Sequence, residues 1–135
     1  MSDEDKKDEK LYFHYTSPEG KKGITESQEI KPSVKRDGDI RYGGNKVYLN
    51  DLHPEKTNSY AVAMNNYDGT PEYAKSRMRD TKFAIGYDSK DIKVKQETKD
   101  RSVYTTKGSL PLDKAKVVYK LGSNGKYEKI ASEED

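Results

Sequence analysis

The chain has 135 residues, with 26 basic and 24 acidic side chains and a formal net charge of +2. Leucine, isoleucine, valine and phenylalanine together supply only about one sixth of the residues, a share often seen in disordered chains. The net charge is nevertheless too small to expand the chain, and 11 tyrosines can bury further apolar area. Length and composition therefore predict one folded domain with a thin, tyrosine-rich core.

The same composition excludes several kinds of site and of partner. Because cysteine is absent, the chain has no disulfide framework and no thiolate chemistry, and the two separate histidines argue against structural zinc, so we expect no metal. Basic and acidic residues are interspersed, without the basic stripe of a nucleic-acid binder. No apolar run approaches the roughly 18 residues of a membrane span. The N-terminal MSDEDKKDEK is not a signal sequence, so we expect a cytoplasmic location.

Residues 1–10 are charged and predict a disordered tail ahead of a domain that covers residues 11–121. LYFHYT at residues 11–16 alternates and predicts a first strand. One face of this strand should carry Leu11, Phe13 and Tyr15. The other face should carry Tyr12, His14 and Thr16. Ser17 followed by Pro18 is typical of a helix start and predicts a short helix that ends near Ser27.

The middle of the chain mixes turns, one strand and short helices. Residues 30–34 are expected to form a short strand or an extended link, and residues 35–44 a loop rich in turn residues. Residues 46–50 predict the second strand, and small and apolar residues predict a helix over residues 57–65. Thr70, Pro71 and Glu72 are a further helix start, for a helix that extends to about Arg79.

The last third of the chain favours strands. They are expected at residues 82–88, 92–96, 101–105 and 115–120, and residues 122–135 should form a terminal strand or a tail. Helices early and strands late predict an α+β domain of two small packed sheets with short flanking helices.

Two strands present side chains that suit a nucleotide with a planar ring. Tyr48 can stack on the ring, and His14 can hydrogen-bond a ribose hydroxyl. Gly43 and Gly44, just before the second strand, let backbone approach a ligand closely. The alternatives are a histidine that bonds a neighbouring backbone carbonyl and a tyrosine that belongs to the core.

The order of the motifs points to a family. LYFHYTS followed by KGITESQEIKPS resembles the opening of the ADP-ribosyltransferase fold, and GGNKVYLND and KTNSYA resemble a segment and a turn of poly-ADP-ribose polymerases. The resemblance is closer to small toxin-type domains with a His-Tyr-Asp signature, the HYD1 ADP-ribosyltransferases. Their later segments look like FAIGYDSKDIKV and SLPLDKAKVV here, so the likeness spans residues 11–119. It implies a split β-sandwich.

The resemblance also implies roles for individual residues. NAD+ would be the substrate, with His14 on a ribose, the backbone of Tyr15 on the nicotinamide carboxamide, and Tyr48 as a stacking wall. Thr16 completes the motif of the first strand and Gly44 precedes the second. If one inserted residue is accepted, Thr57 and Tyr60 match a carboxamide-binding serine and a second stacking tyrosine of the polymerases.

The reaction also needs an acid, because cleaving the nicotinamide–ribose bond develops positive charge on the ribose. The late-strand glutamate of most ADP-ribosyltransferases has no match in DRSVYTT. The HYD1 group implies an aspartate instead, and Asp51 in VYLND is the preferred candidate, with Asp88 and Asp100 as alternatives. Asp51 follows Tyr48 by three residues and so faces the opposite side unless the strand bends, and it could instead only turn the chain before Pro54.

These observations lead us to expect an ADP-ribosyltransferase-like domain that passes ADP-ribose to a macromolecular acceptor or to water. A toxin or effector role would bring secretion by a route without a signal peptide, and an immunity or inhibitor protein as partner. The alternatives are a catalytically weak or inactive module that binds NAD+ or ADP-ribose, and a structural protein whose tyrosines only form the core.

Overall fold

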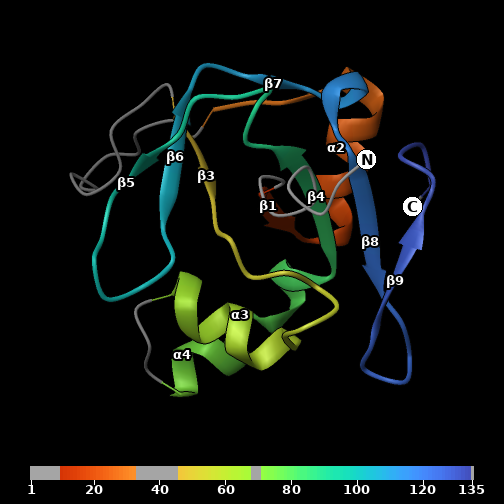
Figure 1. The fold of residues 1–135 in the computed structure, drawn as a ribbon. Helices are drawn as coiled ribbons and strands as arrows, with labels where there is room; N and C mark the ends of the chain where they lie inside the picture. Colours follow the sequence, from red (N-terminus) through yellow and green to blue (C-terminus); the bar gives the residue numbers. More distant parts are fainter. Residues whose placement is uncertain (1–9, 33–45, 68–70, 135) are drawn as a thin grey trace, which may run out of the picture.

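The structure is a computed structural model that describes residues 10–32, 46–67 and 71–134, and it has the expected α+β class (Figure 1). The largest sheet is antiparallel, in the order β1 (Leu11–Thr16), β4 (Phe83–Asp88), β8 (Val117–Leu121) and β9 (Tyr127–Ile130). A second antiparallel sheet has the order β3 (Lys46–Leu49), β6 (Tyr104–Lys107) and β5 (Lys95–Gln96). A third pairs β2 (Glu29–Ile30) with β7 (Leu110–Pro111). The helices are α2 (Pro18–Ser27), α3 (Ser59–Asn66), α4 (Pro71–Ser76), η1 (Met78–Thr81) and η2 (Leu112–Lys114).

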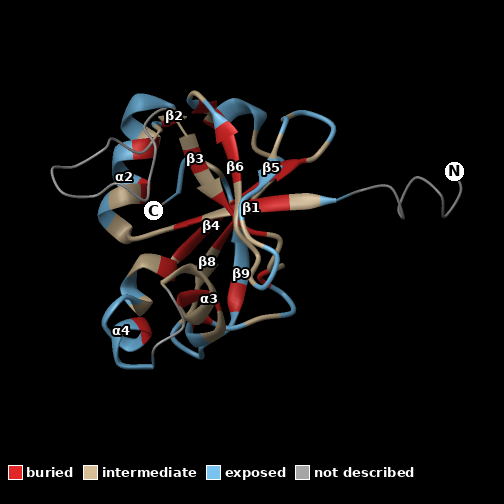
Figure 2. Cartoon of the chain, turned by 90° about the vertical axis from the view of Figure 1, so that its left-hand side faces the viewer, coloured by how far each residue is buried: buried red, intermediate tan, exposed pale blue. Residues whose placement is uncertain are grey.

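The large sheet is packed on both faces, and Figure 2 shows buried segments on its strands. The alternation predicted for residues 11–16 is confirmed, because the two sets of side chains belong to different core clusters. Tyr12 belongs to a core cluster that joins this sheet to α2 and to the β3 and β7 segments. Phe13 and Tyr15 belong to a second cluster, which includes Val62 of α3. All of β4 is buried, because β1 and β8 flank it and both of its faces are packed.

Helix α2 begins and ends as its sequence predicts. The Ser17 hydroxyl accepts a hydrogen bond from the Gly20 amide at 3.1 Å, and Pro18 occupies the first turn. The helix ends at Ser27, and Gln28 adopts the left-handed conformation with φ of 63°. The cap and the proline therefore define where this helix begins.

Lys21 of α2 is fully buried and joins this helix to the end of the described chain. Its ammonium donates to the Thr25 hydroxyl at 2.7 Å and to the carbonyls of Ser132 and Glu134 at 2.8 and 2.6 Å. It also lies 5.7 Å from the centre of the Phe83 ring. A buried ammonium is tolerated here because oxygen acceptors replace its water.

The later helices and strands are shorter than expected. Asn58 caps α3 by accepting from the Ala61 amide at 2.8 Å, so the helix begins at Ser59 and Thr57 lies outside it. The helix expected to reach Arg79 stops at Ser76 and is followed by η1. Strand β5 is only two residues long, and β9 pairs with β8.

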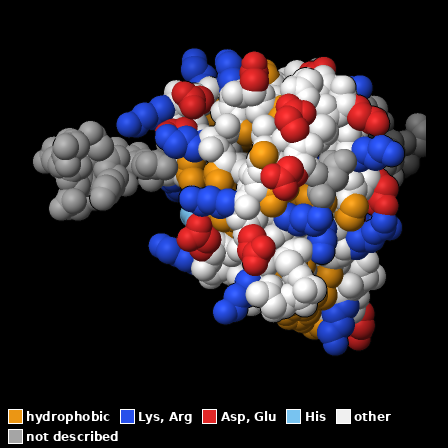
Figure 3. Space-filling model, turned by 90° about the vertical axis from the view of Figure 1, so that its right-hand side faces the viewer, with side chains coloured by type: hydrophobic (Ala, Val, Ile, Leu, Met, Phe, Trp, Pro, Cys, Tyr) orange, Lys and Arg blue, Asp and Glu red, His pale blue; other side chains and the backbone are white. Residues whose placement is uncertain are grey.

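The surface mixes charges, as expected. On the face shown in Figure 3, basic and acidic side chains are interspersed and neither sign forms a continuous stripe. None of the helices in residues 10–32, 46–67 and 71–134 is long and apolar enough to cross a membrane.

Candidate functional site

The two larger sheets touch at one point and then separate. Phe13 of β1 and Asn50, just after β3, exchange backbone hydrogen bonds of 2.7 and 2.9 Å in an isolated bridge. Beyond it β1 continues with His14 and Tyr15, whereas β3 pairs with β6 on its other side. β1 and β3 therefore stay unpaired next to residues 14 and 48, and we call the place between these two strands the strand gap.

His14 bridges the strand gap through one ring nitrogen. Its Nδ1 atom is 2.9 Å from the carbonyl oxygen of Tyr48. A carbonyl can only accept, so Nδ1 carries the hydrogen, and Nε2 of the neutral ring is left as an acceptor. Burial lowers the pKa of the His14 imidazole, and the bond to the Tyr48 carbonyl offsets part of this effect. The alternative of a bond to a backbone carbonyl is thus observed, and it leaves the second nitrogen able to meet a hydroxyl.

The backbone of Tyr15 also faces the strand gap. Peptide groups two residues apart point to the same side of a strand, so the N–H and C=O of Tyr15 point the same way as those of Phe13, toward β3. The Tyr15 side chain points elsewhere: its hydroxyl donates to the Leu52 carbonyl at 2.5 Å, and burial raises the pKa of the phenol. Thr16 is at the end of β1, where its hydroxyl packs against Gly20 of α2.

Tyr48 stands opposite Thr105 on the neighbouring strand β6, so the two side chains share one face of the β3-β6-β5 sheet. Glu97, which sequence reasoning did not single out, reaches the same face. Its carboxylate accepts a 2.6 Å hydrogen bond from the Thr105 hydroxyl and lies 3.6 Å from the Lys46 ammonium. The Thr105 bond lowers the pKa of the Glu97 carboxyl, and Lys46 and Lys95 add to this.

Asp51 lies on the other side of the β3-β6-β5 sheet from the Tyr48 ring. The Ser102 hydroxyl donates to its carboxylate and accepts from its amide at 2.8 Å. The Lys10 ammonium is 3.6 Å from the carboxylate and also lies 5.3 and 5.6 Å from the ring centres of Tyr12 and Tyr104. Tyr104 packs against the core that contains Tyr12, whereas its neighbour Thr105 faces Tyr48. The Asp51 carboxylate and the rings of Tyr12 and Tyr104 therefore surround the Lys10 ammonium.

Two other aspartates considered from the sequence have simpler surroundings. Asp88 accepts from the Lys90 amide at 2.9 Å and lies 3.8 Å from the Lys116 ammonium, as a residue that shapes a turn. Asp100 is exposed in a bend between β5 and β6. Gly44 lies outside the described residues.

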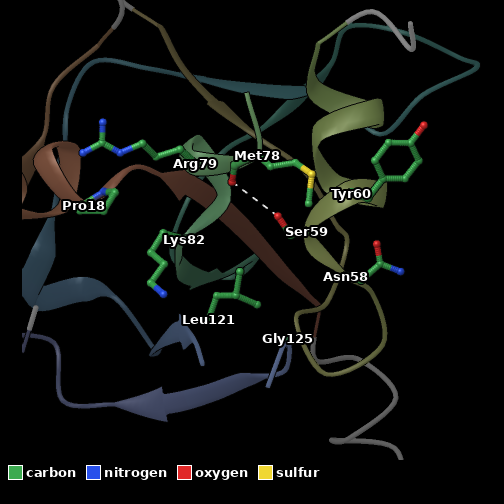
Figure 4. Close-up of a pocket in the computed structure, with 9 residues that line it drawn as sticks. All are labelled: Pro18, Asn58, Ser59, Tyr60, Met78, Arg79, Lys82, Leu121 and Gly125. Atoms are coloured by element: carbon green, nitrogen blue, oxygen red, sulfur yellow. Dashed lines mark hydrogen bonds between the residues drawn. The ribbon is translucent and has the colours of Figure 1, made fainter. Parts of the chain in front are cut away.

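Tyr60 is separated from His14 and Tyr48. It is 36% exposed on the first turn of α3, where it lines a cavity of about 460 Å³ (Figure 4). The other lining residues are Pro18, Asn58, Ser59, Met78, Arg79, Lys82, Leu121 and Gly125. Thr57 precedes the cap of α3 and does not line this cavity. The α3 cavity thus contains Tyr60 but none of the other expected NAD+ residues that the structure describes.

Within the described ranges, no group of three or more His, Cys, Asp or Glu side chains is arranged to hold a metal ion.

A family model described as "HYD1 signature containing ADP-ribosyltransferase" matches residues 11–116. No curated protein and no solved structure matched the chain.

Proposed function

Because this chain belongs to the HYD1-signature ADP-ribosyltransferases, we propose that it cleaves NAD+ and passes the ADP-ribose to a macromolecule or to water. Transfer to water would make it an NAD+ glycohydrolase. The observation that supports the proposal is the strand gap, across which the His14 ring bonds the backbone carbonyl of Tyr48 beside the Phe13–Asn50 bridge.

Each of these groups suits one part of NAD+. The Nε2 atom of neutral His14 can accept a hydrogen bond from a ribose hydroxyl. The N–H and C=O of Tyr15 match the donor and acceptor of the nicotinamide carboxamide, and the Tyr48 ring offers an aromatic face to the nicotinamide. All three interactions position the substrate. Holding NAD+ in the reactive geometry accelerates the reaction even without a group that stabilises the developing charge.

Nicotinamide release by the purified chain tests the proposal. Wild-type protein should release nicotinamide from NAD+, and His14→Ala should lower the rate by about 100-fold or more because the ribose loses its positioning. His53→Ala is the matched control, since His53 lies on the loop after β3 and packs on Phe13 and Tyr119 instead. Equal rates for wild type and His14→Ala would contradict the assignment of the strand gap.

Binding can be tested separately from chemistry. Tyr48→Ala should weaken NAD+ binding by about 1–3 kcal/mol through loss of a stacking face. Tyr73→Ala is the control, because Tyr73 is 47% exposed on α4 and remote in sequence from the strand gap. If calorimetry finds the same affinity for Tyr48→Ala and wild type, NAD+ binds elsewhere, and the α3 cavity with Tyr60 is the next place to examine.

A second candidate function is an NAD+ or ADP-ribose reader that does not cleave its ligand. One observation favours it: the aspartate that the family resemblance nominates, Asp51, is already paired with Lys10 and Ser102. Measurable NAD+ binding without nicotinamide release over hours at high protein concentration would decide for this reader.

We further propose that the domain acts as a toxin on cytoplasmic NAD+ or on a macromolecule there, and that an immunity or inhibitor protein protects the producing cell. The support is the toxin-type family that matches residues 11–116. Induced expression in a test cell should stop growth, and His14→Ala should relieve the arrest at equal protein level. Growth arrest by both forms would argue against NAD+ chemistry as the cause.

A further inference from the structure

Several side chains share the face of the β3-β6-β5 sheet that carries Tyr48. Lys46 and Tyr48 are two residues apart on β3, and Thr105 of β6 stands directly opposite Tyr48. Thr105 is also opposite Lys95 of β5, and two residues further along the chain Glu97 joins the same face. We call Lys46, Tyr48, Glu97 and Thr105 the Tyr48 face.

Glu97 is held in place on this face. The Thr105 hydroxyl donates to its Oε2 at 2.6 Å, and Thr105 itself is only 3% exposed, so this donor has little freedom to move. The Lys46 ammonium lies 3.6 Å from the same oxygen, and the Glu97 side chain keeps 26% of its surface exposed. A carboxylate held by one hydrogen bond and one ion pair, and still open on one side, can respond to charge that develops beside it.

The other acidic candidates lack this relation to Tyr48. The Asp51 carboxylate is bound by Ser102 and by Lys10 on the opposite side of the sheet. Asp88 bonds the amide of Lys90 within a turn. Among the carboxylates of the described residues, Glu97 is the one that bonds the residue directly opposite Tyr48.

We propose that Glu97 is the catalytic carboxylate that stabilises the ribosyl cation beside Tyr48, an inference that rests on the proposed NAD+ cleavage. The bond between ribose C1′ and the pyridinium nitrogen breaks, and its electron pair leaves with neutral nicotinamide. In the hydrolytic case a water oxygen then bonds to C1′ and its proton passes to solvent. Glu97 stays ionised throughout and acts by its fixed negative charge, and Thr105 and Lys46 are positioning residues.

The test measures nicotinamide release and NAD+ affinity for the whole chain. Glu97→Gln keeps the shape and removes the charge, so release should fall about 100-fold or more while NAD+ affinity changes little. Glu97→Asp keeps the charge but shortens the reach, and it should retain part of the activity. Glu128→Gln on β9, an exposed position on the far edge of the large sheet, is the matched control and should match wild type. Thr105→Val should lower release less than Glu97→Gln, with affinity nearly kept.

Each outcome decides. If wild type releases nicotinamide and Glu97→Gln equals it while Asp51→Asn abolishes release, Glu97 is not the acid and the proposed function still stands. If wild type binds NAD+ but releases no nicotinamide, the proposed function and this assignment both fall. If Glu97→Gln sharply lowers the thermal midpoint of unfolding, Glu97→Asp is compared with wild type instead. Nicotinamide release by Glu97→Asp no faster than in a sample without protein would overturn a role that depends on charge.

Discussion

At the scale of the residue, Gly86 lies at the most crowded point of the large sheet. A Cβ atom there would come within 2.7 Å of the Phe13 ring and 2.9 Å of Val117. Phe13 in turn forms the bridge to Asn50 beside the strand gap. Because Gly86 has no side chain, the Phe13 ring can pack directly on its backbone. Phe13 is also the residue that bridges the two sheets at the edge of the candidate site.

Gly86→Ala should destabilise the fold. Inserting a methyl group into this packed face should cost about 1–3 kcal/mol of unfolding free energy. Gly23→Ala is the control, because no atom lies within 4 Å of its added Cβ, and alanine is favoured over glycine by about 0.5–1 kcal/mol in a helix interior. Urea denaturation should thus shift in opposite directions for the two variants, and equal shifts would contradict the packing described at Gly86.

A second residue-scale prediction concerns pH. Burial lowers the pKa of His14 from its ordinary 6.5, so the folded protein holds fewer protons on this ring than the unfolded chain. His14 should therefore contribute full stability above pH 6.5 and lose that contribution as the pH falls below it, well before the carboxylates titrate.

His14→Gln should flatten the decrease in thermal midpoint between pH 7 and pH 5. The pKa of His53 is also lowered by burial, so part of the decrease should persist, and His53→Gln measures that part. A decrease that is unchanged in His14→Gln would mean that the ring is not buried in its neutral form.

At the scale of the element, α2 and β1 were predictable because their signals are local. Ser17, Pro18 and the alternation of residues 11–16 lie next to one another in the sequence, and the structure confirms both elements. The start of α3 was wrong by two residues because Asn58, not Thr57, supplies the cap. Thr57 therefore lies before the cap, whereas Tyr60 lies in the first turn of α3.

Glu97 was missed for the opposite reason. Its relation to Tyr48 depends on the pairing of β3 with β6, whose residues are 57 apart at Tyr48 and Thr105. The two strands expected at residues 92–96 and 101–105 gave a partial signal, because Glu97 directly follows the first of them. No local rule could then pair those strands with residues 46–50.

Helix α2 depends on Lys21 as well as on its cap. Lys21→Met removes the donor to the Ser132 and Glu134 carbonyls and should cost about 2–3 kcal/mol of unfolding free energy, in the range for buried hydrogen bonds to a charged group. Lys22→Met, at the exposed neighbouring position, should change stability by less than about 0.5 kcal/mol. Chemical denaturation of the two variants checks this, and similar losses in both would show that Lys21 contributes nothing special.

At the scale of the whole molecule, stability is unevenly distributed. β4 is buried along its whole length between β1 and β8, whereas both residues of β5 are exposed. The proposed site lies between these extremes, since His14 is on the strand next to β4 and Glu97 directly follows β5.

Hydrogen exchange should report this gradient. Backbone amides of β4 and the facing residues of β1 should exchange most slowly, near the limit set by global unfolding, and those around Lys95 and Gln96 should exchange fastest among the strands. NAD+ should slow exchange at β5 and β6 more than at β4. Equal protection of β4 and β5 in the free protein would contradict this distribution.

The Lys21 contacts have a consequence for how the protein is made. A ribosome delivers the chain in order, so α2 leaves the exit tunnel long before Ser132 and Glu134, the carbonyls that its buried ammonium needs. Until those residues emerge, the Lys21 side chain must stay in water, and the first strand and helix cannot settle into their final packing. The final packing of α2 therefore waits until residues 132–134 have left the ribosome.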